Sequence, residues 1–415
     1  MASISERLRH AGPVRARRYL VLAIALVATV VKLRIAATTF GTSDVRHWAD
    51  FGAAVRHVGP IDIYATRYRL PYNHPPLTGW LLVLLNGIAS HGPSYPFLIR
   101  VPASLADVVT SVLVFELVRR VHSLRNATIA ACVVAVSPVL IFVSGFHGNT
   151  DPVFAMFIIA SAYLVLTDRP VAAGVAAAAA VAIKLVPVVA LPVLVAAVWR
   201  DPRRLFRLAL GFLALFLPLW VPVVLRQWAG FKRNVLDYRG ISPAQTRWGI
   251  VDFARHAHQS GLVDFLVGPG RFAAIAISAL VPAILVLRRP ADVATGVALS
   301  LVLFLLLTTT FGTQYLAWAA AGALFCDLWL GGLFNVTAGI MLAVIYMHWS
   351  DGFPWNVAIP HRLTGGEEAI GWLVWVVLLA GAVVGVRRLK DRPITEYASL
   401  PSTMSRTDLT VKEGA

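Results

Sequence analysis

The sequence predicts an all-α, polytopic membrane protein with about 11–13 transmembrane helices and further amphipathic helices at the membrane surface. The chain has 415 residues, of which 58% are hydrophobic and 14% charged, and its mean hydropathy is +0.72. Soluble domains are nearer to roughly 45–50% apolar and about 25% charged residues. Twelve spans of about 20 residues would occupy roughly 240 positions, which approaches the hydrophobic content itself. A soluble protein of this composition would expose more apolar surface than monomers tolerate.

The charge composition is explained by the membrane rather than by a nucleic acid. The chain carries 37 Lys and Arg against 21 Asp and Glu, a net charge of +16. Basic loops on the cytoplasmic side are how helical membrane proteins fix their orientation. We therefore expect membrane lipids, and no nucleic acid, as partners. Cys132 and Cys326 lie in apolar runs without metal or redox spacing, so we expect them to be buried small hydrophobic residues.

The N-terminal tail, residues 1–18, is rich in arginine and precedes an apolar run from Tyr19 to Val31. No small-residue cleavage site follows this run, so the sequence predicts an uncleaved first helix that starts in the cytoplasm. Lys32 and Arg34 stand near the far end of this helix. We expect their side chains to extend to the membrane interface.

The first outer loop, residues 40–96, is polar and aromatic and predicts helices that lie on the membrane surface. Helical spacing from Asp44 places Trp48 and Phe51 on one apolar face, and Gly59-Pro60 ends the helix. The later apolar run Leu77–Ala89 is too short to cross a membrane comfortably. It also must not cross if the arginines at 119, 120 and 125 are to be cytoplasmic.

The rest of the chain alternates between spans and loops, with basic residues in the short inner loops. The predicted spans are 97–118, 127–146, 153–167, 171–183, 185–199, 205–225, 271–287, 291–311, 315–331, 333–349 and 369–386. Long outer loops are expected at 226–270 and 350–368, C-terminal transmembrane helices over 271–386, and a cytoplasmic tail over 387–415. The last 20 or so residues are rich in Ser, Thr and charge, and their composition predicts disorder.

Two polar segments are expected on the same outer face of the membrane. One is the loop that contains Asp44, and the other is the tight turn from His147 to Pro152. Asp44 and Asp151 would then face one another across one cavity. The alternative for each acid is a local role, because Asp44 begins a helix and Asp151-Pro152 is an ordinary helix start.

Three ionisable residues fall inside or near the predicted spans. Arg100 stands at the outer start of a helix, Asp107 two turns deeper, and Lys184 at the tip of a short hairpin. Charges in a membrane usually face protein and often mark function. For Asp107 the alternative is a buried contact that orders helix packing, and for Arg100 and Lys184 it is structural pairing. The outer loop that contains Arg247, counted together with Arg271 at its end, has seven basic residues and three acidic residues. This excess of positive charge suits binding of a lipid phosphate.

Several motifs together resemble a known superfamily. They are Ser43-Asp44, Gly59 to Tyr64, Tyr72-Asn73-His74-Pro75-Pro76-Leu77, Ile99-Arg100-Val101-Pro102, Ser137-Pro138 with the turn at 146–151, and Lys184-Leu185-Val186-Pro187. Their order and common sidedness resemble the GT-C superfamily of polyprenyl-phosphate-sugar-dependent membrane glycosyltransferases. This superfamily includes bacterial lipid-linked mannosyltransferases and the glucosyltransferases of asparagine-linked glycan assembly. The likeness covers roughly residues 19–200, and the turn His147-Gly148-Asn149-Thr150-Asp151 departs from that of some relatives.

The resemblance implies that residues 19–225 form a catalytic module. The module would move a hexose from a polyprenyl-phosphate-linked donor to a lipid or glycan acceptor, and mannose is the hexose that the resemblance favours. The reaction would take place on the extracytoplasmic side of the cell membrane. It needs a base for the acceptor hydroxyl and cations for the leaving phosphate. The implied site residues are Asp44 as base, Asp151 as a second catalytic acid, Arg100, Lys184 and Arg247 for the phosphate, and His74, His147, Tyr72, Tyr64 and Trp48 for acceptor or sugar.

No organic cofactor is implied, and the use of a divalent metal stays open. Each aromatic residue in the implied set has an alternative role as an anchor at the membrane interface. Two other classes of protein have many spans and buried charge. A transporter or flippase for lipid-linked sugars would be favoured by broken helices in corresponding halves, which the sequence does not suggest. A structural subunit of an envelope-assembly complex would make the convergence of Asp44, His74 and Asp151 accidental.

Overall fold

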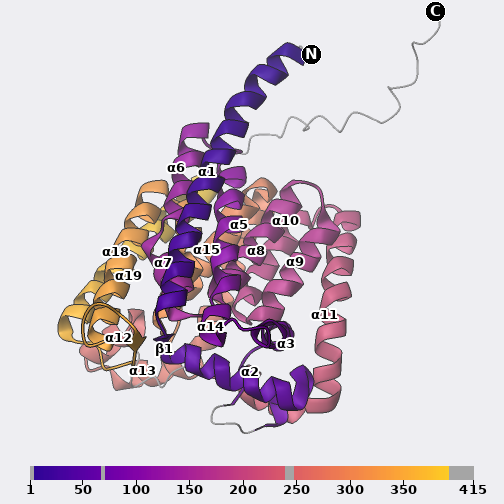
Figure 1. The fold of residues 1–415 in the computed structure, drawn as a ribbon. Coiled ribbons are helices and arrows are strands. Elements are labelled where there is room, and N and C mark those ends of the chain that lie inside the picture. Colours follow the sequence, from indigo (N-terminus) through magenta and orange to yellow (C-terminus); the bar gives the residue numbers. More distant parts are fainter. Residues whose placement is uncertain (1–3, 67–70, 239–246, 392–415) are drawn as a thin grey trace, which may run out of the picture.

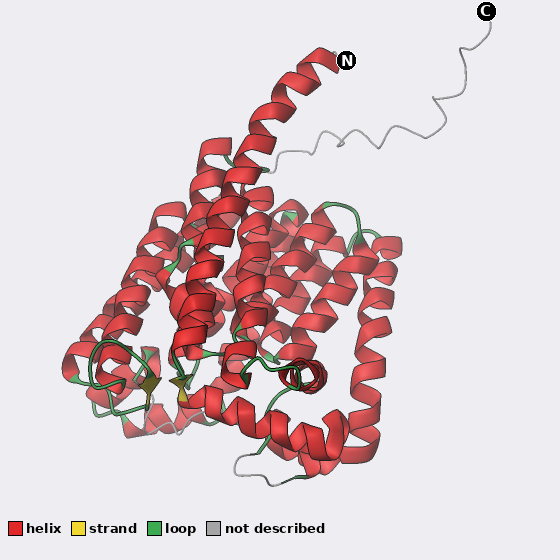
Figure 2. Ribbon diagram, in the orientation of Figure 1, coloured by secondary structure: helices red, strands yellow, loops and turns green. Residues whose placement is uncertain are grey.

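The structure is a computed structural model that describes residues 4–66, 71–238 and 247–391. Figure 2 shows that the described residues are almost entirely helical. The strands are two residues each, β1 (Gly41–Thr42) and β2 (Val357–Ala358), and they pair in parallel. The long apolar helices confirm the predicted all-α, polytopic membrane fold.

Eight helical segments of the described residues are long and apolar enough to cross a membrane. Several of them combine short helices that continue one another. They are built from α1 (Ile4–Thr38), α4 with α5 (Tyr95–Leu98, Val101–Val118), α6 with α7 and the π-helix η2 (Leu124–Ala135, Pro138–Phe142, Val143–His147), α11 with η4 (Pro202–Phe231, Lys232–Leu236), α14 (Gly270–Arg288), η6 with α15 (Pro290–Asp292, Val293–Leu307), α18 (Leu328–Trp349) and α19 (Gly365–Asp391).

Shorter apolar helices complete the bundle: α8 (Asp151–Leu166), α9 (Pro170–Ile183), and η3 with α10 (Val186–Ala190, Leu191–Val198). The eight long segments and these three shorter ones together make 11 possible spans, which is the lower end of the predicted 11–13. Helix α9 packs between α8 and α11. Its contact with α11 is close because both carry glycine there, and a Cβ on Gly174 would lie 2.1 Å from the carbonyl oxygen of Leu208.

The remaining helices gather at the end of the bundle opposite the N-terminus (Figure 1). They come from the segments that the sequence places on the outer face. They are α2 (Ser43–Asp62), η1 (Ile63–Ala65), α3 (Pro76–Ala89), α12 (Gly249–His256) and α13 (Ser260–Val267). Helix α3 lies across the bundle axis and is seen end-on in Figure 1, which agrees with the prediction that Leu77–Ala89 does not cross.

Helix α2 has the predicted amphipathic character. Trp48 and Phe51 are buried on its inner face, and the helix is interrupted at Gly59, whose φ of 84° suits glycine. The N-cap is Thr42, whose Oγ1 accepts a hydrogen bond from the backbone N–H of Asp44. Asp44 is therefore not the capping residue of α2, and its carboxylate is available for other contacts.

Two predictions from the sequence, one for Lys32 and one for a helix break near residue 332, are wrong. The Lys32 side chain does not extend to the interface, because it is 1% exposed and its Nζ lies 2.6 Å from Oδ2 of Asp107. This pair confirms the expectation that Asp107 makes a buried contact between helices. The predicted break at residues 331–333 lies instead at Asp327, whose carboxylate caps α18 by accepting from the N–H groups of Trp329 and Leu330.

The segment before that cap is also irregular. It consists of η7 (Thr313–Leu316), α16 (Ala317–Ala320) and α17 (Gly322–Cys326), in place of the predicted single span. Helix α15 ends at Leu307, so residues 308–312 form a non-helical stretch at the same end as α2. The predicted disordered tail lies outside the described residues.

Candidate active site

A cavity of about 640 Å³ opens at the end of the bundle that carries α2. Its wall is formed by the start of α2, the segment before α3, the turn that follows η2, the start of α14 and the stretch from 308 to 318. The polar side chains that line it are Ser43, Asp44, His47, Asn73, His74, Asn149, Lys184, Tyr238, Arg271, Thr308, Thr309, Thr310, Gln314 and Tyr315. Of the predicted site residues, the cavity therefore brings together Asp44, His74 and Lys184, and also Trp48.

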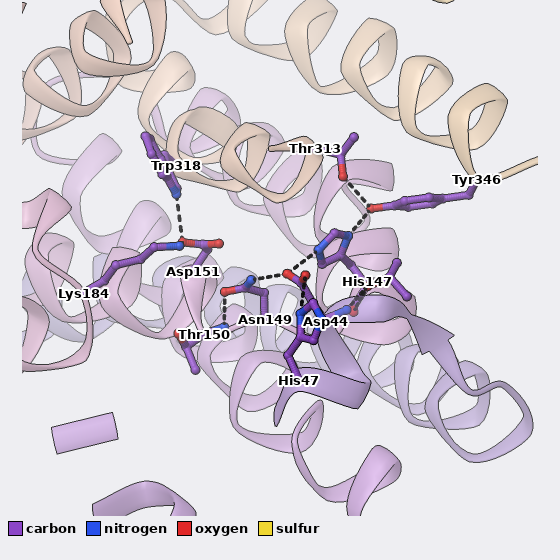
Figure 3. A network of polar contacts seen from close by, with 11 residues as sticks. Asp44, His47, His147, Asn149, Thr150, Asp151, Lys184, Thr313, Trp318 and Tyr346 are labelled. Atoms are coloured by element: carbon purple, nitrogen blue, oxygen red, sulfur yellow. Dashed lines mark hydrogen bonds and ion pairs between the residues drawn. The ribbon is translucent and has the colours of Figure 1, made fainter. Parts of the chain in front are cut away.

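Asp44 is held by side chains from a distant part of the chain. Its Oδ2 accepts hydrogen bonds from Nε2 of His147 and Nδ2 of Asn149, both at 3.0 Å (Figure 3). Its Oδ1 lies 3.9 Å from Nδ1 of His47, and the side chain is 29% exposed. Burial alone would raise the pKa of Asp44. The hydrogen bond and charge of His147, with His47 and Asn149, outweigh burial and hold that pKa at about 2.

The turn from 143 to 151 supplies the groups around Asp44, and its backbone explains how. The π-helix η2 ends at Gly148, which has a left-handed φ of 77°. A Cβ at Gly148 would lie 2.6 Å from the side chain of Val45, so the glycine allows the start of α2 to approach. Thr42 fastens the contact by donating its hydroxyl to the carbonyl oxygen of His147.

Asp151 does not line the cavity, contrary to the expectation that it faces Asp44 there. Its side chain is fully buried, and its Oδ1 accepts from Nζ of Lys184 at 2.5 Å and from Nε1 of Trp318 at 2.9 Å (Figure 3). The Lys184 side chain is 17% exposed and reaches the cavity. Asp151 thus holds the ammonium of Lys184 against the rings of Tyr315 and Trp318.

Arg100 does not reach the cavity, so the structure argues against its predicted role as a phosphate ligand. Its guanidinium is fully buried and donates five hydrogen bonds, at distances of 2.7–3.1 Å. The acceptors are the carbonyl oxygens of Ala36, Thr39, Pro96 and Gly145 and the hydroxyl of Thr39. A guanidinium has five N–H groups, so no donor remains for a phosphate.

Arg247 is also occupied away from the cavity. Its Nε lies 3.1 Å from Oε1 of Glu368, and its Nη1 lies 3.5 Å from Oδ1 of Asp252. The cation that does line the cavity beside Lys184 is Arg271, at the start of α14. Among the described residues, Arg271 makes no ion pair with a carboxylate, and its guanidinium stacks on Phe272. Sequence reasoning counted Arg271 among seven loop cations and had no signal to select it.

The aromatic residues divide into two groups. Tyr64 and Tyr72 are buried beneath α2, where their rings pack edge to face. The hydroxyl of Tyr64 donates to the carbonyl oxygen of His74, which fixes the segment before α3. The predicted sugar contacts of Tyr64 and Tyr72 are not supported, because neither residue lines the cavity.

Trp48 and His74 do line the cavity, with their rings stacked 4.3 Å apart. Burial, with a further contribution from the charge of Lys184, lowers the pKa of His74 to about 3. His74 is therefore a neutral imidazole at neutral pH, and its buried Nδ1 has no hydrogen-bond partner in the described structure. Within residues 4–66, 71–238 and 247–391, no group of three or more His, Cys, Asp or Glu side chains is placed to hold a metal ion.

Comparison with known proteins finds a family model that is similar to the middle of the chain. Residues 73–228 match the family model described as dolichyl-phosphate-mannose-protein mannosyltransferase. This segment contains His74, His147 and Lys184 but neither Asp44 nor Arg271. No curated protein sequence matches the chain significantly.

Two solved structures are similar in overall fold at low sequence identity. ArnT from Cupriavidus metallidurans bound to undecaprenyl phosphate is 16% identical, with 90% of this chain and 78% of that chain covered and a TM-score of 0.49. The oligosaccharyltransferase of Archaeoglobus fulgidus in the apo form is 13% identical, with 89% and 56% covered and a TM-score of 0.39. The match over residues 73–228 agrees with the predicted resemblance to GT-C glycosyltransferases.

The assignment of Arg100 as a structural residue makes a testable prediction. Arg100→Lys leaves at least two buried acceptors unpaired, because lysine has three donors. Each unpaired group costs roughly 1–3 kcal/mol, so the purified variant in detergent is expected to unfold at a clearly lower temperature. The control is Arg226→Lys, since Arg226 makes an exposed pair with Asp62, and such pairs contribute about 0–1 kcal/mol. An Arg100→Lys protein as stable as wild type that binds donor poorly would restore Arg100 as a phosphate ligand.

Proposed function

We propose that this protein is a membrane hexosyltransferase that takes a sugar from a polyprenyl-phosphate-linked donor and transfers it to a hydroxyl of a lipid or glycan acceptor. Mannose is the sugar that we propose. One observation carries the proposal: an ionised carboxylate, Asp44, lines a cavity together with the cations Lys184 and Arg271. The reaction needs these groups, a base for the acceptor and cations for the leaving phosphate. The description of the matched family, which names a mannosyl phosphate lipid as donor, supports the choice of substrate.

Asp44 is the proposed base. Its Oδ2 is occupied by His147 and Asn149, so Oδ1 is the oxygen that is left to accept a proton from an acceptor hydroxyl. A pKa of about 2 means that the carboxylate is ionised before substrate binds. The same low pKa makes Asp44 a weak base in the empty cavity. The negative charge of a bound donor phosphate raises the pKa of a nearby carboxylate, which moves Asp44 toward the range in which it accepts a proton.

Charge balance favours Arg271 as the second phosphate ligand. Lys184 is paired with Asp151, so this pair adds little net positive charge to the cavity. The phosphate gains negative charge as the sugar leaves, and a second cation would stabilise that change. Among the described residues that line the cavity, Arg271 is the one arginine. Lys184 and Arg271 are therefore the proposed phosphate partners in place of Arg100 and Arg247.

The remaining cavity wall supports a substrate with a lipid chain. Part of the cavity lining is apolar, with contributions from η3, η4, α13, α14 and α15. The side chains concerned are Leu185, Val186, Val235, Val267, Ala274, Ile275 and Phe304. An apolar wall next to paired cations fits a molecule that joins a hydrocarbon chain to a phosphate, because each part meets surface of its own character.

The polar lining favours a neutral sugar over a cationic amino sugar. Asp44 is the one carboxylate among the described residues that line the cavity, and a bound ammonium group would need an acidic partner of its own. The other polar groups there include the amides of Asn73 and Gln314 and the hydroxyls of three consecutive threonines, 308–310. Such groups donate to and accept from sugar hydroxyls. A hexose such as mannose meets these conditions.

The proposed orientation places the cavity on the extracytoplasmic side of the cell membrane. The cavity lies at the end of the bundle opposite the N-terminus (Figure 1). The arginines of the short loops fall at the boundaries of α5, α10, α11, α14 and α19 instead. These are Arg119, Arg120, Arg200, Arg203, Arg204, Arg288, Arg289, Arg387 and Arg388. The positive-inside rule assigns loops of this kind to the cytoplasm.

The first test of the function is Asp44→Asn. The purified protein in lipid is incubated with radiolabelled polyprenyl-phosphate mannose, or the glucose equivalent, and a membrane lipid extract. Loss of a general base typically lowers the rate 10²–10⁴-fold. Folding is expected to be unchanged, because Thr42 caps α2. Asp50→Asn on the same helix is the matched control and should transfer normally. Normal transfer by Asp44→Asn would exclude Asp44 as the base.

The second test concerns the leaving phosphate. Arg271→Gln should raise KM for the donor about 10–100-fold, because a charge-assisted hydrogen bond contributes roughly 1.5–3 kcal/mol. The control is Arg233→Gln, which removes the same charge from an exposed position of η4 outside the cavity. Equal KM values for the two variants would remove Arg271 from the proposed site.

The third test concerns orientation. Single cysteines at Thr66 and Gln259, in a background without Cys132 and Cys326, should react with a membrane-impermeant maleimide added to whole cells. A cysteine at Arg200, at the opposite end of the bundle, should react only after lysis. The reverse pattern would contradict an extracytoplasmic cavity while leaving the geometry of the site unchanged.

A further inference from the structure

A chain of hydrogen bonds leads from Asp44 into the bundle, and the side chains in it have no role in the reaction proposed above. Nε2 of His147 lies 3.0 Å from Oδ2 of Asp44, and Nδ1 of the same ring lies 2.7 Å from the hydroxyl of Tyr346 (Figure 3). That hydroxyl is 3.5 Å from Oγ1 of Thr313. His147 and Tyr346 are both buried. The contacts join α2, η2, α18 and η7, which are far apart in the sequence.

The partners of the His147 ring determine what it presents to Asp44. An ionised carboxylate only accepts hydrogen bonds, so Nε2 must carry a proton that it donates to Asp44. Nδ1 then accepts from the Tyr346 hydroxyl if the ring is neutral, or donates to it if the ring is charged. The hydroxyl satisfies both states because it is donor and acceptor. Tyr346 therefore holds the ring of His147 in the orientation in which Nε2–H faces Asp44, in either state.

We infer that His147 and Tyr346 are positioning residues for Asp44. His147 fixes Oδ2 and stabilises the ionised carboxylate, so that Oδ1 stays directed to the cavity, and Tyr346 holds the His147 ring in the orientation that does this. The inference rests on the proposed role of Asp44 as base. It makes His147 a residue that acts through Asp44, whereas the sequence resemblance implied a direct contact with acceptor or sugar. This assignment agrees with the position of His147, which does not line the cavity.

Other titratable groups near Asp44 must be separated from His147 in any test. His47 lies on the same helix, 3.9 Å from Oδ1. His74, from the segment before α3, interacts electrostatically with both Asp44 and Lys184. Three further phenols interact with the charge of Asp44, namely Tyr238, Tyr315 and Tyr346. Of all these groups, His147 makes the shortest contact with Asp44 and, after burial, the largest contribution to its low pKa.

A purely structural role for the same contacts is the alternative. The ring of Tyr346 packs near Phe142, Phe146, Trp349 and Trp355, so a large change there would disturb the fold. Tyr346→Phe keeps the ring and removes only the hydroxyl. For His147, glutamine carries an amide nitrogen near the position of Nε2, whereas the shorter asparagine carries one near the position of Nδ1. His147→Gln therefore retains a donor toward Asp44, and His147→Asn removes it.

The experiment measures protonation of Asp44 directly, by infrared difference spectroscopy of the carboxyl C=O stretch of the full chain in lipid nanodiscs. The Asp44→Asn protein identifies the Asp44 band. In wild type, Asp44 should stay ionised down to about pH 3, since its pKa is about 2. His147→Asn should raise the midpoint by about one pH unit or more, His147→Gln should stay close to wild type, and Tyr346→Phe should fall between them. An Asp44 midpoint that is the same in wild type, His147→Asn and Tyr346→Phe would overturn the inference.

Transfer kinetics separate this inference from the proposed function. If both hold, the acidic limb of kcat/KM moves upward in His147→Asn together with the infrared midpoint, while KM for the donor is unchanged. A shifted midpoint in a protein that transfers no sugar would contradict the function and leave the coupling intact. An unshifted midpoint with normal transfer would contradict the coupling and leave the function intact. If His147→Asn fails to fold, Tyr346→Phe alone decides, because it removes a single hydroxyl.

Discussion

Four of the five hydrogen bonds of the buried Arg100 guanidinium join the end of α1 to the turn from 143 to 151. Each side of this junction carries one part of the site. The chain that leaves α1 enters β1 and then α2, which begins one residue before Asp44. The turn carries His147, Asn149 and Asp151. In a lipid environment no water is present to donate hydrogen bonds to free carbonyl groups. The guanidinium therefore supplies the donors that these carbonyl oxygens need, and it sets the distance between the two segments.

A second buried contact supports the same junction one turn deeper. Lys32 pairs with Asp107, and the hydroxyl of Ser144, inside η2, donates to the same carboxylate oxygen at 2.7 Å. The backbone approach is equally close, since a Cβ at Gly145 would lie 3.1 Å from Cα of Lys32. α1 and η2 are thus locked together by an ion pair, a hydroxyl and a glycine. The groups that surround Asp44 are pre-organised in the empty cavity, as electrostatic catalysis requires.

The sequence predicted the fold well because membrane helices follow from local composition. Apolar runs of the required length, Gly59-Pro60 and the basic loops each carry their signal within a few residues. The failures concern long-range pairing. The surroundings of Arg100 in the sequence are apolar, so nothing nearby shows that Ala36 and Thr39, some 60 residues earlier, and Gly145 together accept four of its five hydrogen bonds. The break at Asp327 depends on a single side chain, whose carboxylate accepts from the N–H groups of Trp329 and Leu330.

The candidate site shows the same division. Asp44, His74 and Lys184 were selected from motifs and do meet at one cavity. The partner of each, however, depends on packing: Asp44 is bound by His147, 103 positions away, and Lys184 by Asp151, 33 positions away. Arg271 could not be separated from the other loop cations without knowing that α14 starts at the cavity rim. Residue type and order therefore predict which polar groups a site contains and on which side of the membrane they lie. Which partner each group binds, and so its charge and reactivity, depends on the tertiary structure.

The most direct measurement is a structure of the full chain in nanodiscs with a polyprenyl phosphate bound. The central claim is that one cavity holds the phosphate on one side and the proposed base on the other. The account predicts the phosphate between Lys184 and Arg271, with the hydrocarbon chain along the apolar wall near Ile275 and Phe304 and with Oδ1 of Asp44 still open to the cavity. A phosphate held at Arg247, or at the opposite end of the bundle near Arg388, would contradict it.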